Sequence, residues 1–264
     1  MEALIYQKGL RNKTAARHFY NYLNFLDPAG VSFRAINYGF DDGKMIPLNP
    51  QEQAHCFRLA LYNHLVVASG VDLKGKRVLE TAVGRGAGAS YIARHFRPKS
   101  IHGIDISERS IEFDRDYYHI SGLTFSAGDA EGIGFAPNSF DAVLDVESFH
   151  YYPHPERAIA EAYRALDKEG YYLVADMVPA GQIKGFMEGL KAPGFRLAKD
   201  PEDITENVVR SLQNEADQKE VAINNQVPLL LRPLFQVFAG QPGTFFYNEL
   251  QAKRLCYLNV VLQK

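Results

Sequence analysis

The chain has 264 residues, enough for one large α/β domain or for a domain with a cap. Its formal net charge of −2 excludes the basic field that would attract nucleic acid or an anionic membrane surface. The two cysteines, Cys56 and Cys256, lie far apart, so the sequence predicts neither a disulfide framework nor a metal site, and it favours a reducing cytoplasm. The N-terminus lacks the pattern of a signal peptide, and no window of about 18 apolar residues predicts membrane insertion.

Strands and helices are predicted to alternate through the middle of the chain. Residues 1–48 are rich in aromatic side chains and are expected to be irregular, and a helix is predicted from Pro50 to Ser69, where Gly70 ends it. The alternating units that follow argue for a parallel sheet with helices on both faces. The predicted strands are 77–82, 100–105, 123–126, 140–146 and 171–176, and the predicted helices are 87–96, 108–119 and 155–166.

The pattern changes after residue 180. Residues 181–235 carry a mixed apolar and charged helical pattern, which we interpret as a cap. A short helix or strand is expected at 244–247 and a final strand at 256–262. We therefore expect four parts: an N-terminal lid with helices (1–70), an α/β core (71–180), a helical cap that shapes the substrate pocket (181–243), and the final strand or strands of the core (244–264).

A glycine-rich turn between two acidic strand ends is the most informative motif. Glu80 ends an apolar strand, Gly84, Gly86 and Gly88 follow it, and Asp105 ends the next strand. Glycine lets the backbone approach a ligand closely, and the N-terminus of the following helix favours negative charge. A carboxylate at the end of the next strand suits a ribose diol, because it accepts two hydroxyl hydrogen bonds. The motif therefore predicts a cofactor that contains a nucleoside.

The glycine spacing alone leaves the identity of that cofactor open. Gly84-x-Gly86-x-x-Ala89, with Asp105 further on, also satisfies the dinucleotide fingerprint. Glu80 discriminates between the two, because a carboxylate just before the loop repels a pyrophosphate and attracts a cationic amino group. S-adenosyl-L-methionine carries such a group and a sulfonium but no phosphate, so Glu80 favours this methyl donor over a nicotinamide cofactor.

Three further strand ends carry candidate chemistry. Asp129 and Ala130 follow the third strand, where the carboxylate can accept from the adenine amine and the Ala130 amide can donate to a ring nitrogen. His150 follows the fourth strand, on the side where the methyl group is expected, and histidine suits a general base. Asp176, at the end of the fifth strand, is expected to orient that imidazole, and His154 is the competing candidate for the base.

An aromatic segment near the N-terminus is a candidate lid. Tyr38, in the run Asn37-Tyr38-Gly39-Phe40, is expected to close over the donor and to add cation–π attraction to the sulfonium. Packing in the core is the alternative for this side chain. A lid suits methyl transfer, because the protein has mostly to align donor and acceptor and exclude water.

The motifs resemble those of class I S-adenosylmethionine-dependent methyltransferases, and more closely the phthiotriolone/phenolphthiotriolone dimycocerosate methyltransferases and related natural-product O-methyltransferases. The resemblance runs from Ile36 to the C-terminus and adds Ala82, Ile106 and Glu147 to the cofactor-binding positions, although Ala82 stands where many members have a glycine. It implies a Rossmann-like, doubly wound sheet of seven strands, mostly parallel with an antiparallel last strand. The segments that carry it are Val78–Glu80, Gly84–Tyr91, Gly128–Glu131, Ser139–Asp141, Val146–Glu147, His150–His154 and Ala175–Asp176.

Together these features predict an enzyme that transfers a methyl group to a hydroxyl or enol oxygen of an apolar small molecule, a polyketide- or lipid-like metabolite, and releases S-adenosyl-L-homocysteine. C- or N-methylation, an NAD(P)-dependent oxidoreductase, and a non-methylating protein that binds the donor stay open as alternatives. The acceptor cannot be named from the residues. The oligomeric state stays open as well, with a homodimer as one alternative.

Overall fold

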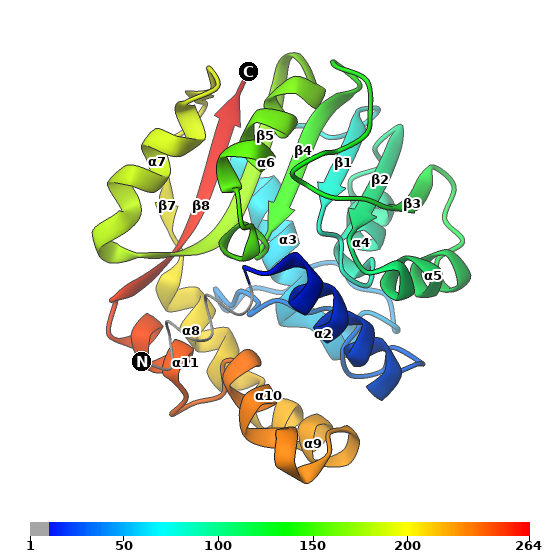
Figure 1. Ribbon diagram of the computed structural model, residues 1–264, viewed down its shortest axis with the longest axis vertical. Helices are drawn as coiled ribbons and strands as arrows, with labels where there is room; N and C mark the ends of the chain where they lie inside the picture. Colours follow the sequence, from blue (N-terminus) through cyan, green and yellow to red (C-terminus); the bar gives the residue numbers. More distant parts are fainter. Residues whose placement is uncertain (1–10) are drawn as a thin grey trace.

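An eight-stranded sheet forms the centre of the computed structural model, which describes residues 11–264 (Figure 1). The strand order is β3-β2-β1-β4-β5-β8-β6, and β7 also pairs with β8. The first five strands are parallel, whereas β8 runs antiparallel to β5. The strands are β1 (Arg77–Thr81), β2 (Ser100–Asp105), β3 (Leu123–Ala127), β4 (Phe140–Val146), β5 (Leu166–Pro179), β6 (Arg196–Leu197), β7 (Glu202–Asp203) and β8 (Leu255–Gln263).

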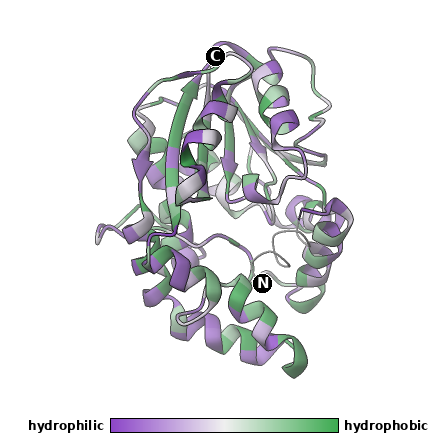
Figure 2. Ribbon diagram, turned by 60° about the vertical axis from the view of Figure 1, so that its left-hand side comes forward, coloured by the Kyte–Doolittle hydropathy of each residue, from purple (hydrophilic) through white to green (hydrophobic). Residues whose placement is uncertain are grey.

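Apolar side chains on both faces explain why the central strands are continuous apolar runs. Val78 and Leu144 belong to one buried cluster, while their neighbours Leu79 and Val143 belong to a second cluster on the opposite face. This alternation is the period of two that a strand imposes, and a parallel sheet is normally covered on both faces. Figure 2 shows the resulting hydrophobic colouring along the strands.

Seven helices form two layers, one on each face of the sheet, and each layer packs against one of the two clusters of buried apolar side chains. The helices of one layer contribute to the cluster of Val78, and α6 and α7 contribute to the cluster of Leu79. The first layer contains α3 (Cys56–Ser69), α4 (Ala87–His95), α5 (Glu108–Tyr117), α8 (Thr205–Asn214) and α11 (Phe245–Gln251), and the second contains α6 (Pro155–Ala165) and α7 (Ile183–Lys191).

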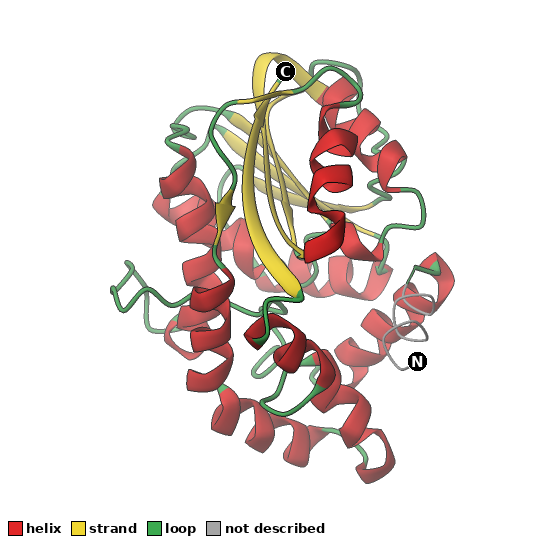
Figure 3. Cartoon of the chain, turned by 90° about the vertical axis from the view of Figure 1, so that its left-hand side faces the viewer, coloured by secondary structure: helices red, strands yellow, loops and turns green. Residues whose placement is uncertain are grey.

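A separate helical group lies beyond the carboxyl ends of the parallel strands (Figures 1 and 3). It consists of α2 (Lys13–Leu26), α9 (Ala216–Gln226) and α10 (Arg232–Phe238), which share a small core around Leu23 and Phe235. The short 3₁₀ segments are η1 (Gln53–His55), η2 (Phe149–Tyr151), η3 (Ala180–Gln182) and η4 (Leu229–Leu231).

The expectation of an irregular N-terminal region is wrong for α2. Asn12 caps this helix through its side chain, which accepts from the Ala15 N–H at 3.1 Å. The apolar face of α2 finds its partner about 200 residues away, in the core with Ile223 and Val227, so the helix depends on a contact that local pattern does not reveal. Residues 1–10 of the predicted N-terminal part lie outside the described residues.

Other differences from the expected elements are local. The α-helix predicted from Pro50 begins at Cys56, after a turn and η1. β5 begins at Leu166 rather than at residue 171, because Leu166 already pairs with Phe140 before a shift in register. The sheet has eight strands where seven were expected: six longer strands and two two-residue strands, β6 and β7, which both pair with β8. Residues 244–247 belong to the start of a helix, α11.

No helix within residues 11–264 is long and apolar enough to cross a bilayer.

Candidate active site

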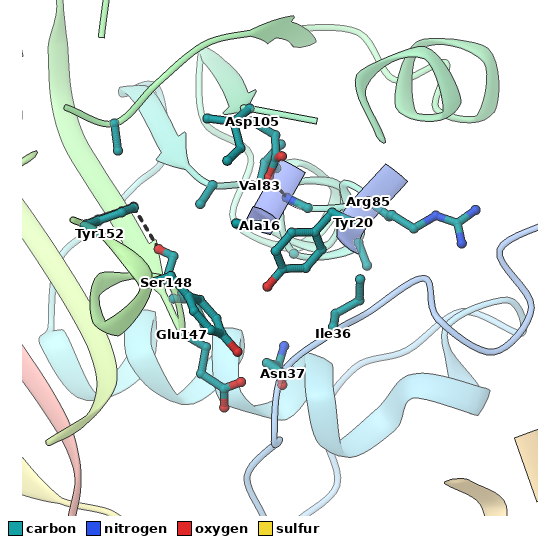
Figure 4. Close-up of a pocket in the computed structure, with 18 of the residues that line it drawn as sticks. Ala16, Tyr20, Ile36, Asn37, Val83, Arg85, Asp105, Glu147, Ser148 and Tyr152 are labelled. Atoms are coloured by element: carbon teal, nitrogen blue, oxygen red, sulfur yellow. Dashed lines mark hydrogen bonds between the residues drawn. The ribbon is translucent and has the colours of Figure 1, made fainter. Parts of the chain in front are cut away.

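A cavity lies at the carboxyl ends of the parallel strands, between the glycine-rich turn, the end of β4 and helix α2 (Figure 4). We call it the first cavity. The parallel strands end here because they all run in one direction, which is the usual place for a ligand on an open α/β sheet. Most of the predicted cofactor-binding positions line it, namely Ala82, Gly84, Asp105, Ile106, Asp129, Ala130 and Glu147.

The two predicted glycines do different work. Gly84 has a φ of +60°, and a Cβ built on it would meet nothing within 4 Å, so the backbone is open towards the cavity. Its N–H donates to Asp105 Oδ2 at 2.9 Å, which holds the turn against the end of β2. Gly86 faces the other way: a Cβ there would lie 2.7 Å from the Tyr118 ring. Gly86 therefore lets α4 begin close to α5 and does not line the cavity.

Glu80 lies directly behind the cavity wall. The carboxyl is 1% exposed, and its Oε1 accepts from the Tyr62 hydroxyl at 2.7 Å, while Tyr62 itself lines the cavity. Its Oε2 has no hydrogen-bond partner among the described residues. Burial raises the pKa of Glu80 to about 8, because a carboxylate without a cation is costly in this place. An unpartnered buried acid next to a cavity fits a ligand that brings its own positive charge.

The other acids of the cavity are held differently. Asp105 accepts from the Ser107 N–H at 2.8 Å as well as from Gly84, yet burial still raises its pKa to about 6. Asp129 Oδ2 lies 2.5 Å from the Lys13 ammonium, which is also 2.7 Å from Glu131 Oε2. Lys13 was not expected from the sequence, and it ties helix α2 to the loop after β3.

Glu147 stands at the boundary between the first cavity and a second one. Its Oε1 accepts from the Tyr38 N–H at 2.7 Å and from the Tyr257 hydroxyl at 2.9 Å. Burial raises the pKa of Glu147 to about 7. Tyr38 lines the second cavity and not the first, so its backbone positions Glu147 while its ring faces the cap side.

The second cavity has a volume of about 260 Å³ and lies between the N-terminal segment and helices α9 and α10. Its walls are largely apolar, with Ile36, Phe235 and Phe238 among them. The wall between the two cavities is formed by residues that line both, namely Tyr20, Ala35, Ile36, Asn37, Glu147 and Tyr151. Figure 4 shows Tyr20, Ile36 and Asn37 facing Glu147 across this boundary.

The structure brings the two predicted catalytic residues together. The ring nitrogen His150 Nδ1 lies 2.5 Å from Asp176 Oδ1, and the backbone N–H of His150 donates to Asp176 Oδ2 at 3.2 Å. Burial alone would lower the pKa of His150, but the Asp176 carboxylate, with Glu147 beyond it, raises it above the ordinary value. His150 lines a third cavity that shares Tyr151 and Met177 with the second.

His154, the competing candidate, is placed differently. Its side chain is 52% exposed and lies 3.5 Å from Glu156, at the start of α6. It lines none of the three cavities described here. Within residues 11–264, no group of histidine, cysteine or acidic side chains is arranged to hold a metal ion.

The residues that sequence reasoning missed come from outside the strand ends. Lys13 and Tyr20 lie on α2, Tyr62 on α3, and Lys219 on α9, all of them on cavity walls. No local motif marks them, because each reaches the cavities through packing between segments far apart in sequence. Phe19 and Tyr20 belong to the aromatic-rich N-terminal region, and the sequence indicates no particular role for either of them.

Comparison with known proteins gives the class. The profile of the family described as "Methyltransferase domain" matches residues 79–174. The fatty-acid O-methyltransferase of Mycolicibacterium smegmatis is 35% identical over 82% of this chain and 78% of its own length. The phthiotriol/phenolphthiotriol dimycocerosates methyltransferase of Mycobacterium tuberculosis is 33% identical over 84% of this chain and 82% of its own. The chain therefore belongs to the class I S-adenosylmethionine-dependent methyltransferases, and S-adenosyl-L-methionine is its methyl donor.

Within that class, its place is the group that contains these two relatives. Among solved structures, the [4+2]-cyclase SpnF has a TM-score of 0.69 and 20% identity over 92% of this chain and 94% of its own. At that identity the likeness concerns the fold alone, and it agrees with the Rossmann-like sheet expected from the motifs. The family assignment removes the nicotinamide alternative that the glycine spacing had left open.

Proposed function

We propose that this enzyme transfers the methyl group to an oxygen of an apolar, lipid- or polyketide-like small molecule, with His150 as the base. The observation that carries the proposal is the His150–Asp176 pair, 2.5 Å apart, beside two cavities with apolar walls. The name of the relative from Mycolicibacterium smegmatis, a fatty-acid O-methyltransferase, supports an oxygen acceptor and a lipid-like substrate.

The chemistry of the first cavity fits the donor. The unpartnered Glu80 oxygen, behind the Tyr62 hydroxyl, suits the methionine ammonium. Asp105 suits the ribose diol, and Asp129 with the Ala130 amide suits the adenine. When bound, the donor supplies a methyl group already activated on a sulfonium, so the protein has mainly to align the acceptor and exclude water.

His150 has the geometry of a base. Because its Nδ1 faces Asp176, the ring carries its proton there and leaves Nε2 free to accept the proton of an acceptor hydroxyl. Asp176 keeps the ring in that tautomer and stabilises the imidazolium that forms. The base form of His150 increases as the pH rises through its pKa. Because Asp176 raises that pKa, turnover should rise at a higher pH than an ordinary histidine would give.

The test is His150→Ala, assayed with isotope-labelled donor against a panel of long-chain hydroxyl acceptors, which must lose a proton when they are methylated. We expect turnover to fall by roughly 10² to 10⁴-fold, while the dissociation constant for S-adenosyl-L-homocysteine changes little. His154→Ala is the matched control and should keep turnover. Unchanged turnover in His150→Ala removes the base role, and a product methylated at carbon or nitrogen removes the assignment to oxygen.

A further inference from the structure

We infer that Lys219 binds a carboxylate of the methyl acceptor inside the second cavity. The inference rests on the proposed function, because it takes the second cavity as the place of the acceptor. It adds a chemical class, an amphiphile with an apolar chain and an acidic group. It also makes Lys219 the residue that determines this specificity.

Lys219 is a buried cation on the wall of the second cavity. Lys219 lies on α9, is 6% exposed and lines the second cavity. Its ammonium is 6.0 Å from the centre of the Tyr38 ring, and the Tyr38 backbone bonds to Glu147 at the boundary of the first cavity. A buried ammonium on an apolar wall is rare, because an unpaired charge is expensive to remove from water.

The hydrogen bonds of the Lys219 ammonium are incomplete. The ammonium has three protons to donate. It lies 3.3 Å from Glu215 Oε2 and 3.3 Å from the Ala239 carbonyl oxygen, both long contacts for a charged donor. Among residues 11–264 this ammonium has no third hydrogen-bond acceptor, and its remaining contact is the Tyr38 ring at 6.0 Å. Burial lowers the pKa of Lys219 despite Glu215, as expected for a cation that is incompletely compensated.

Positive charge exceeds negative charge around Glu215. Glu215 Oε2 is shared, because Arg58 Nε also lies 3.2 Å from it. Arg58 has further acceptors in the Ser32 and Ala35 carbonyl oxygens, both at 3.1 Å, whereas Lys219 has the Ala239 carbonyl alone. Two buried cations thus share one carboxylate, and a carboxylate on the acceptor would restore neutrality.

Glu147 supplies only part of that missing charge. Both contacts of its Oε1, the Tyr38 N–H and the Tyr257 hydroxyl, hold it on the strand side of the boundary. Its pKa, raised to about 7 by burial, leaves it only partly ionised at neutral pH.

The apolar walls of the second cavity indicate the chemistry of the remaining part of the ligand. Val31, Phe33, Ile223, Phe235 and Phe238 give the second cavity an apolar surface. An alkyl chain is suited to such walls, with roughly 0.8 kcal/mol for each CH₂ removed from water, while the single ammonium fixes the position of the head. The ligand is therefore a chain that carries one acidic group besides the hydroxyl that is methylated, and inorganic anions or uncharged chains are poorer matches.

The experiment measures binding of laurate and of its uncharged counterpart lauramide by calorimetry, with the protein saturated with S-adenosyl-L-homocysteine. Wild type should bind laurate more tightly than lauramide. Lys219→Met should weaken laurate binding by roughly 10- to 100-fold and leave lauramide within about 2-fold, because only the charged contact is lost. Lys219→Arg should keep the preference. Lys184→Met, which removes a 90% exposed lysine, is the matched control and should change neither ligand.

Three outcomes would overturn the inference: equal wild-type affinity for the two ligands, equal weakening of both in Lys219→Met, or loss of the preference in Lys184→Met. The wild-type comparison needs no variant, so it decides even where Lys219→Met does not fold. Failure of the proposed function is a separate result, namely O-methyl transfer that persists in His150→Ala or a product methylated elsewhere. Binding of S-adenosyl-L-homocysteine, measured first, shows whether the donor site is intact.

Discussion

Two residues other than glycine adopt a positive φ where strands meet the first cavity. Ala82 has a φ of +50° after β1, and Glu147 has a φ of +51° after β4. A side chain in this region costs about 1–2 kcal/mol, because its Cβ approaches the following carbonyl oxygen. At Glu147 the conformation directs the carboxylate to the boundary between the cavities, so the strain accompanies a candidate functional group. At Ala82 the methyl group offers no comparable gain.

Ala82→Gly should therefore stabilise the protein by about 0.5–1 kcal/mol, the relief of strain less the greater freedom of glycine in the unfolded chain. Urea unfolding measures this difference. Ala89→Gly, inside helix α4, is the control and should destabilise by about 1 kcal/mol or more. A loss of stability in Ala82→Gly similar to that in Ala89→Gly would contradict the strain argument.

Helix α2 forms one wall of the first cavity and is held by ion pairs near both of its ends. At its beginning Lys13 pairs with Asp129 and Glu131, and just beyond its end Asp27 lies 3.5 Å from the buried Arg85 of the glycine-rich turn. The volume left in the cavity is about 90 Å³. Small-molecule sites usually hold at least about 300 Å³, so we expect α2 to move outward when the donor binds. The exposed Lys13 end is the easier one to release, because the Asp27–Arg85 pair is buried.

Lys13→Met should accelerate association of S-adenosyl-L-homocysteine by roughly 2- to 5-fold, a modest effect because the lysine is partly exposed and its ion pairs are weakened by water. The physical reason is a larger fraction of molecules with α2 already displaced. Stopped-flow binding of a fluorescent homocysteine analogue measures the rate. Lys44→Met removes an exposed ion pair with Asp42 elsewhere and serves as the control. An association rate that is unchanged or slower would exclude α2 as the gate.

The elements most accurately predicted from the sequence are those whose signals are local. The strands from residue 77 to 146, the turn at Gly84 and helix α4 follow from apolar runs and glycines, and the acids at strand ends follow from the direction of parallel strands. The α2 helix, the Lys13 pairs and the buried Lys219 do not follow, because they depend on contacts between segments 100 to 200 residues apart. His150 and Asp176 were predicted as a pair because two neighbouring strands end beside each other.

The molecule as a whole concentrates buried acids at one end of its sheet. Burial raises the pKa of Glu80 to about 8, of Glu147 to about 7, and of Asp105 and Asp145 to about 6. Each folded-state pKa exceeds the unfolded value, so the folded protein holds protons that the unfolded chain has already lost. The resulting stability is complete below the unfolded pKa and is lost as pH rises through the folded pKa.

The unliganded protein should lose stability between pH 6.5 and 8, and Glu80 should account for about 1–2 kcal/mol of that loss. His55, with its pKa lowered to about 3 by burial, is neutral in the folded state, and because its unfolded-state pKa is about 6.5 it opposes this loss by only a few tenths of a kcal/mol, in both wild type and variant. Thermal unfolding of wild type and Glu80→Gln across this range measures the difference, and wild type should show the steeper fall. Saturation with S-adenosyl-L-homocysteine should flatten the wild-type curve, because its ammonium compensates the carboxylate. Parallel curves for the two unliganded proteins would contradict a protonated Glu80.

The wall shared by the two cavities has a consequence for how such enzymes diversify. Strand ends and the glycine-rich turn line the first cavity, where we propose that the donor binds, while the N-terminal segment and helices α9 and α10 build most of the second, where we propose that the acceptor binds. Mutations in those helices can retune substrate choice without touching the machinery that handles the donor. Exchange of the segment 216–239 between homologues is therefore a natural starting point for engineering new specificities, with the shared wall left intact.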